Sequence, residues 1–188
     1  LDQVTTAFPN ARVVVVGYAP IASRQSDIKT TARYFFKIIS FPPKLQSLAT
    51  NPVMRQFLKP FRDKFAQRSD VWIAESNKEI RAAIAKTNLG FLEPRVFFVE
   101  TPIKPESSYG TTNPMVWEVG PNHEPNDETF VERKAGCAQV FKEMKYQHYG
   151  RLSTRMCELS SIAHPNVAGS RAYAEAIKEI LRTNVLLP

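Results

Sequence analysis

Two short runs of consecutive apolar residues stand out from the pattern of polar and apolar positions along the chain. They are residues 11–17 (ARVVVVG) and residues 95–100 (RVFFVE). Each holds four consecutive β-branched or aromatic residues, which is typical of a strand buried on both faces of a parallel sheet. We therefore predict two interior parallel strands. Residues 18–21 (YAPI) leave the first strand at its carboxyl end, where open α/β sheets place their sites.

Apolar residues at helical spacing predict three helices. The first begins at Ser69 and Asp70 and stops near residues 88–90, the second is capped by Asn126 and Asp127, and the third spans residues 167–182. Their apolar positions are Ile73, Ile80 and Ile84; Phe130, Ala138, Phe141 and Met144; and Ala172, Tyr173, Ala176, Ile177, Ile180 and Leu181. The order strand, helix, strand, helix, helix predicts an α/β fold with a parallel sheet.

Segment 28–66 is basic and aromatic. It holds eight Lys or Arg and a single acid, Asp63, so it accounts for the net charge of +7. It also holds seven aromatic residues, and Pro60 is expected to interrupt a long helix here. Three interpretations stay open: a helical insertion packed on the core with a solvated basic face, a lid or membrane-surface element that meets anionic lipid, and a nucleic-acid-binding face.

Length and composition fit one ordinary globular domain. The chain has 188 residues, of which 43% are hydrophobic and 23% charged. These values exclude a collagen, a disordered tail and a disulfide-dense miniprotein. No stretch approaches the roughly 18 apolar residues of a membrane span. Because the chain opens without Met and without a signal-peptide core, we expect Leu1 to follow a segment that was removed or left out.

The two cysteines, Cys137 and Cys157, allow either a disulfide that closes a loop of about 20 residues or two buried thiols. A zinc site that combines them with His148 and His164 is disfavoured, because no close ligand pair such as C-x-x-C occurs. We expect neither a metal nor a cofactor.

His164 lies in the most specific stretch of the chain, residues 160–177 (SSIAHPNVAGSRAYAEAI). A His followed by Pro and Asn, then a Gly and an amphipathic pattern, predicts an imidazole in a loop just before a helix. Such a loop gives a general base both orientation and access to substrate. His123 and His148 lie in no comparable motif.

This stretch resembles the catalytic-histidine block of the SGNH (GDSL-type) hydrolases, a family of esterases and lipases. That block reads Asp-x-x-His-Pro-Asn-x-x-Gly before the final helix. Residues 8–23 (FPNARVVVVGYAPIAS) look like the family's fourth strand. Residues 95–103 (RVFFVETPI), with the later NPMVWEVG and ERKAGCAQ, are similar to the fifth strand and the Trp-containing loop of the bacterial secreted lipase-like branch. The resemblance covers about two-thirds of the chain and leaves segment 28–66 outside.

The resemblance implies a three-layer α/β/α sandwich with a parallel, flavodoxin-like sheet. This chain (residues 1–188) would be the C-terminal portion of one hydrolase domain, with segment 28–66 as an insertion. It also implies a secreted or extracellular protein in which Cys137 and Cys157 are bonded. The implied activity is hydrolysis of carboxylic esters, lipids among them, with His164 as general base.

Two departures from the family pattern shape this expectation. No Gly-Asp-Ser block or Gly-x-Ser-x-Gly elbow occurs, and neither Ser23 nor Ser161 has such a setting. We expect a separate N-terminal segment to supply the nucleophile, the oxyanion hole and the missing strands, since two parallel strands cannot satisfy their own edges. The triad acid, three residues before His164, is replaced by Ser161, so a backbone carbonyl or another carboxylate would orient the imidazole.

The rival interpretation is a non-catalytic remnant or binding module that applies its basic segment to anionic lipid or another polyanion. A nucleic-acid-binding domain is the third and weakest, and we expect no nucleic-acid partner.

Overall fold

Strands β1 (Val13–Val16) and β2 (Val96–Val99) pair in parallel, with Val13 opposite Val96 and Val16 opposite Val99. The structure is a computed structural model, which describes residues 1–38, 51–120, 124–143 and 150–184. The prediction of two parallel strands is confirmed. The prediction that both are buried on both faces is wrong for β1, whose Val16 is 41% exposed. Within the described residues the sheet has two strands, so no further strand pairs with the other edge of β1.

Between the strands, the chain forms α2 (Ile28–Ile38) and a single long helix, α4 (Pro52–Asn88). The prediction that this helix begins at Ser69 and Asp70 is wrong. It begins four turns or more earlier, where the Asn51 side chain accepts a hydrogen bond from the Val53 amide at 2.9 Å. The predicted insertion, segment 28–66, therefore does not end at a boundary of the structure, because residue 66 lies inside α4.

Pro60 lies within α4 without ending it. A proline removes one backbone hydrogen bond and strains the preceding turn, so other contacts must hold the helix together. Phe61 and Phe65 supply them, because both rings pack edge-on against Phe35 of α2, at centroid distances of 4.8 and 5.1 Å. This aromatic cluster lies within the segment that the sequence marks as basic and aromatic.

Asn88 connects the end of α4 to the start of β2. Its Oδ1 accepts hydrogen bonds from the amides of Arg95 and Val96, both at 3.0 Å. Its Nδ2 donates to the Val96 carbonyl at 2.8 Å. The helix ends here, as the sequence predicts, because the side chain that closes it also fixes the next strand.

The remaining elements are mostly helical. They are α1 (Asp2–Ala7), the 3-10 turn η2 (Pro105–Ser107), α5 (Phe130–Glu143), α6 (Gly150–Glu158) and α7 (Val167–Asn184). The predictions of α5 and α7 are confirmed, although Met144 lies outside the described residues. Helices α1 and α6 were not predicted. None of the described helices has both the length and the apolar character that a bilayer-crossing helix needs.

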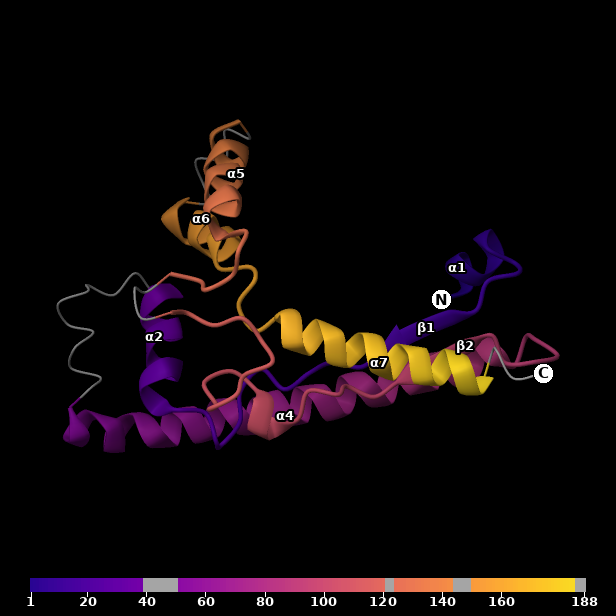
Figure 1. Cartoon of the computed structure of the whole chain (residues 1–188), viewed down its shortest axis with the longest axis horizontal. Helices are drawn as coiled ribbons and strands as arrows, with labels where there is room; N and C mark the ends of the chain where they lie inside the picture. The colour runs from indigo at the N-terminus through magenta and orange to yellow at the C-terminus, as the bar shows by residue number, and fades with distance from the viewer. Residues whose placement is uncertain (39–50, 121–123, 144–149, 185–188) are drawn as a thin grey trace.

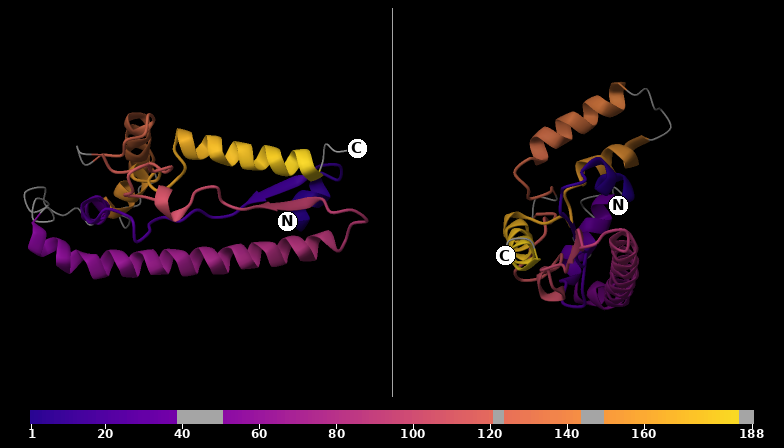
Figure 2. Two further views of the ribbon diagram at one scale, coloured as in Figure 1. Left: turned by 60° about the horizontal axis from the view of Figure 1, so that its bottom comes forward. Right: turned by 90° about the vertical axis from the view of Figure 1, so that its right-hand side faces the viewer.

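Helices α4 and α7 lie on opposite sides of the β1–β2 pair, while α5 and α6 stand apart from the sheet (Figures 1 and 2). The chain is thus a mixed α/β structure, mostly helical, around a small parallel sheet. The apolar positions of α7 are half-buried along one side, as its pattern predicts.

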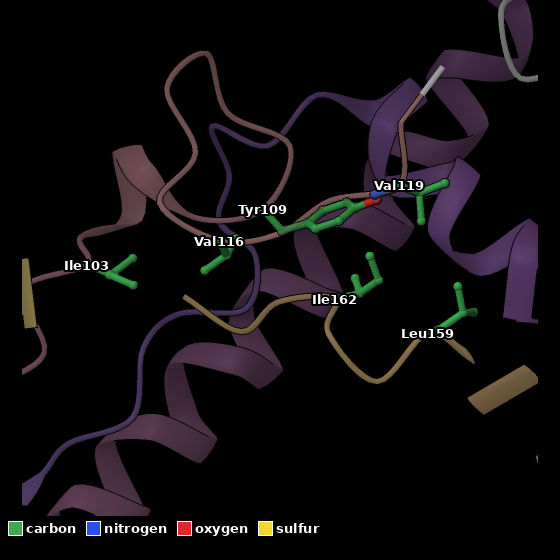
Figure 3. Close-up of a cluster of buried hydrophobic side chains, with 6 residues drawn as sticks. All are labelled: Ile103, Tyr109, Val116, Val119, Leu159 and Ile162. Carbon is green, nitrogen blue, oxygen red and sulfur yellow. The ribbon is translucent and has the colours of Figure 1, made fainter. Parts of the chain in front are cut away.

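The densest buried cluster lies in loops beyond the carboxyl ends of the strands (Figure 3). Its members are Ile103, Tyr109, Val116, Val119, Leu159 and Ile162. Tyr109 also bonds through its hydroxyl, which donates to the Thr30 carbonyl at 3.3 Å and accepts from the Val119 amide at 3.4 Å. Burial raises the pKa of this phenol, so it stays protonated. The cluster therefore fixes loops 103–119 and 159–162 to each other, and these loops frame the site.

Candidate active site

A cavity of about 500 Å³ opens at the carboxyl end of β1. This volume is within the usual range for small-molecule sites. Five parts of the chain meet there: the end of β1 with the segment after it, helix α2, the middle of α4, the loop before α7 and α7 itself. The lining residues are Val16, Gly17, Tyr18, Ala19, Ile21, Tyr34, Trp72, Ile162, Ala163, His164, Pro165, Tyr173 and Ile177. They are mainly apolar and aromatic, and His164 is the one side chain in this lining with a basic nitrogen.

Aromatic side chains form much of the cavity wall. The rings of Tyr18 and Trp72 lie 4.5 Å apart at an angle of 57°, so helix α4 contributes directly to the wall. Tyr173 of α7 donates a hydrogen bond from its hydroxyl to the Gly17 carbonyl at 3.1 Å and lies 2.9 Å from Thr101 Oγ1. Burial raises the pKa of Tyr34 and of Tyr173, so both phenols stay neutral at this wall.

His164 is in the loop immediately before α7, where the sequence predicts it, and its side chain is exposed. Hydrogen bonds hold both its backbone amide and its backbone carbonyl. The His164 amide donates to the Ser161 carbonyl at 3.0 Å, and the His164 carbonyl accepts from the Trp117 amide at 2.9 Å. The Trp117 carbonyl in turn accepts from the Ala163 amide at 3.0 Å. A rigid backbone therefore carries a side chain that is open to solvent.

Ala163 has a φ of 65°, the one non-glycine residue in the left-handed region within the described part of the chain. This conformation costs an alanine on the order of 1–2 kcal/mol. The hydrogen bonds to Trp117 maintain it. Strain of this kind occurs at functional sites more than elsewhere, and here it sets the direction in which His164 leaves the backbone.

Asn166 and Gly169 have structural tasks that account for their place in the motif. Asn166 Oδ1 accepts from the Gly169 amide at 3.0 Å and so caps α7, while its Nδ2 donates to the Pro114 carbonyl at 2.8 Å. Gly169 is buried, and a Cβ at this position would collide with the Met115 carbonyl oxygen. The motif thus brings the first turn of α7 against residues 114–116.

Ser161, three residues before His164, stands where the resemblance to the SGNH hydrolases predicts an acid, and it does not turn toward His164. Its hydroxyl donates to Asp127 Oδ2 at 2.6 Å and accepts from Arg133 Nη2 at 2.9 Å. Among the described residues, none forms a hydrogen bond with the His164 imidazole. Hence no carboxylate in the described part orients this ring.

Asp127 and Arg133 form a bidentate ion pair beside Ser161. The two Nη–Oδ distances are 2.8 and 2.6 Å, and the side chains are 4% and 17% exposed for Asp127 and Arg133. Arg133 Nε also donates to the Glu158 carbonyl at 3.0 Å, which ties α5 to the end of α6. The hydrogen bonds from Arg133, followed by those from Ser161 and Thr129, lower the pKa of Asp127 well below the usual carboxyl value, although burial opposes them. Sequence reasoning took Asp127 only as a helix cap and missed this ion pair.

Cys137 of α5 and Cys157 of α6 form a disulfide with a Cα–Cα distance of 5.9 Å. This bond is consistent with the pairing that the resemblance implies. It also removes both sulfurs from the zinc ligand set considered above, whose His148 lies outside the described residues. In the described part of the chain, no three or more His, Cys, Asp or Glu side chains gather in a way that could hold a metal ion.

The cavity lining does not supply a nucleophile for ester hydrolysis. None of the residues that line it is Ser, Thr or Cys. Ser23 is buried, and its Oγ accepts a hydrogen bond from the Gln25 amide at 3.1 Å. The hydroxyl of Ser161 is held by Asp127 and Arg133.

Comparison with protein-family models, with curated proteins and with solved structures finds no match to this chain.

Proposed function

We propose that this chain is the C-terminal part of an α/β/α hydrolase of carboxylic esters, with His164 as general base. The observation that carries the proposal is the position of His164. An exposed imidazole lies at a largely apolar cavity, at the carboxyl end of a parallel strand, on a turn that is held in a strained conformation. The resemblance of its motif to the SGNH hydrolases adds the reaction class.

The proposed reaction needs a serine from a separate N-terminal segment that carries a Gly-Asp-Ser block. His164 accepts the proton of that hydroxyl while its oxygen attacks the ester carbonyl, and then returns the proton to the leaving alcohol. Backbone or side-chain donors of the same segment stabilise the tetrahedral oxyanion. Water then attacks the acyl-enzyme, again with His164 as base. The apolar and aromatic cavity wall suits the acyl part of the ester.

The outer edge of β1 supports such a segment. In the described residues β1 and β2 pair only with each other, so this edge of β1 has no strand partner. On the outer edge of β2, the Asn88 side chain already bonds the amide and the carbonyl of Val96. Further parallel strands placed on the edge of β1, between α4 and α7, would complete the proposed three-layer sandwich. They would also cover Val16 at the end of β1.

The test compares the full-length protein with its His164→Ala variant on short p-nitrophenyl esters. We expect kcat/KM to fall at least 1,000-fold, on the order of the loss when a catalytic base is removed. The circular dichroism spectrum and the melting temperature should stay unchanged, because no described residue bonds to the imidazole. His123→Ala and His148→Ala serve as controls and should retain activity.

Activity of His164→Ala within tenfold of wild type would exclude the assignment. Absence of activity in a wild-type protein shown to contain a Gly-Asp-Ser segment would favour the rival function, a non-catalytic binding module.

A further inference from the structure

One face of α4 is exposed along five turns of the helix. Its residues follow one another at intervals of three or four positions: Val53, Phe57, Phe61, Lys64, Arg68 and Val71. We call these six residues the α4 stripe. At 1.5 Å per residue the stripe is about 27 Å long. Helix α4 borders the molecule, with the strands, α2 and α7 all on one side of it (Figure 2).

The apolar members of the stripe are large and strongly exposed. Phe57 is 74% exposed, Val53 64% and Val71 59%. Phe61 is 51% exposed, although one edge of its ring packs on Phe35. Single exposed apolar residues need no explanation, but Val53, Phe57 and Phe61 follow one another on one helix face, and a group of this kind marks an interaction site. Val71 lies further along the same face, beyond Lys64 and Arg68.

The charged members of the stripe are both cations. Lys64 and Arg68 are exposed, and neither forms an ion pair with a described residue. The two acids of this stretch, Asp63 and Asp70, each precede a stripe residue by one position, which places them about 100° around the helix. Asp63 is also paired with Arg62, at 2.7 Å. The six residues of the stripe are therefore apolar and positive. One turn beyond Val71 on the same face, the exposed Glu75 is paired with Lys78 at 3.5 Å.

We propose that the α4 stripe binds the surface of an anionic lipid bilayer. Apolar side chains that enter the acyl boundary, with lysine and arginine at the level of the headgroups, are the features of a helix that lies in the membrane interface. Arg55 and Lys59 are exposed as well, but they lie on the opposite face of α4 and are not part of the stripe. The proposal does not depend on ester hydrolysis.

The charge and the exposure of the stripe together favour an anionic bilayer over a nucleic acid or a second copy of the chain. A nucleic acid would neutralise Lys64 and Arg68 but would leave Phe57, Val53 and Val71 against a polar phosphate backbone. A second copy that packed its own stripe against this one would bring the same two cations, while the carboxylate that follows the stripe, Glu75, is paired with Lys78 of its own helix. A bilayer with anionic lipid satisfies the apolar and the positive parts at once.

The stripe also lies next to the cavity that contains His164. Trp72 directly follows Val71 on α4, and its ring forms part of the cavity wall against Tyr18. A bilayer bound along the stripe would therefore lie near that wall.

The test measures co-sedimentation of the full-length protein with vesicles of phosphatidylcholine alone and of phosphatidylcholine with phosphatidylserine. We expect binding to the anionic vesicles, at least tenfold weaker binding to the neutral ones, and weakening by added salt. Lys64→Glu combined with Arg68→Glu should lower the partition coefficient at least 25-fold, since each interfacial cation contributes about fivefold. Phe57→Ser should lower it about tenfold.

Matched variants separate the stripe from general surface properties. Lys104→Glu with Arg171→Glu changes the net charge equally at exposed sites away from the stripe, and Val131→Ser removes an apolar side chain that is 77% exposed on α5. Both should bind vesicles within twofold of wild type. Equal binding to neutral and anionic vesicles, equal losses in these controls, tighter binding to DNA than to the anionic vesicles, or a stripe-dependent dimer without vesicle binding would each overturn the proposal.

Discussion

Replacing Asp127 by Asn should destabilise the protein by about 2–4 kcal/mol. The carboxylate is nearly buried and accepts hydrogen bonds from Arg133, Ser161 and Thr129. An amide of the same shape removes the charge, and its NH₂ group faces a donor where the carboxylate offers an acceptor. Hydrogen bonds to charged groups contribute about 1.5–3 kcal/mol each, and the mostly buried Arg133, left without its partner, costs more. A loss of this size is a large share of a domain's net stability of about 5–15 kcal/mol.

Urea unfolding followed by circular dichroism, with the disulfide intact, measures this loss. With a slope of about 1–3 kcal/mol per molar urea, the midpoint should fall by about 1–2 M at pH 7. Glu128→Gln is the matched control, because this neighbouring carboxylate is exposed, and it should change stability by less than about 0.5 kcal/mol.

The pH dependence of the same measurement tests the physical cause. Because the pKa of Asp127 is lowered in the folded state, its ionised form contributes stability above the unfolded carboxyl pKa of about 3.9. That contribution is lost as the pH falls from there toward the folded pKa. The difference between wild type and Asp127→Asn should therefore be constant from pH 7 to about pH 5 and shrink below about pH 4. A difference below about 0.5 kcal/mol at pH 7, or one that does not shrink in acid, would refute the reasoning.

Two further predictions concern the helices around the site. Gly169→Ala should cost about 1–3 kcal/mol, since its Cβ would collide with a backbone oxygen of Met115, whereas Gly136→Ala in α5 meets nothing within 4 Å and should stabilise the protein by about 0.5–1 kcal/mol. Equal melting temperatures for these two variants would contradict the packing of α7 described above. Thiol titration of the denatured, unreduced protein should find no free thiol at Cys137 or Cys157, and two after reduction. Two free thiols before reduction would show that α5 and α6 are not linked.

The elements that could be predicted from the sequence are those with a local signal. Four β-branched or aromatic residues in a row marked each strand, and apolar pairs at helical spacing marked α7. The start of α4 could not be predicted in this way. Pro60 and the surrounding charges resemble an interruption, and the contact that outweighs them, Phe61 and Phe65 on Phe35, joins residues of two helices.

The candidate site shows the same division. The place of His164 before α7 follows from neighbouring letters of the sequence, and the structure confirms it. The partner of Ser161 does not follow from them, because Asp127 lies 34 positions earlier and carries the ordinary signature of a helix cap. The two hydrogen bonds that join Trp117 to the turn likewise cross a long stretch of chain. Contacts between residues so far apart in the sequence depend on how the loops pack, and loop packing leaves no periodic pattern in the sequence.

The motif around His164 divides into residues with a structural task and one without. Asn166 caps α7, Gly169 allows close approach to Met115, and Ser161 joins the ion pair of Asp127. The His164 imidazole makes no hydrogen bond to a described residue, yet the turn that carries it includes a strained alanine. The strained turn is bonded to Trp117 through its backbone, and it also sets the direction in which the His164 side chain leaves the backbone. This asymmetry is the reason that the proposed base is His164 rather than any neighbouring polar residue, and it makes His164→Ala the variant whose effect should fall on activity alone.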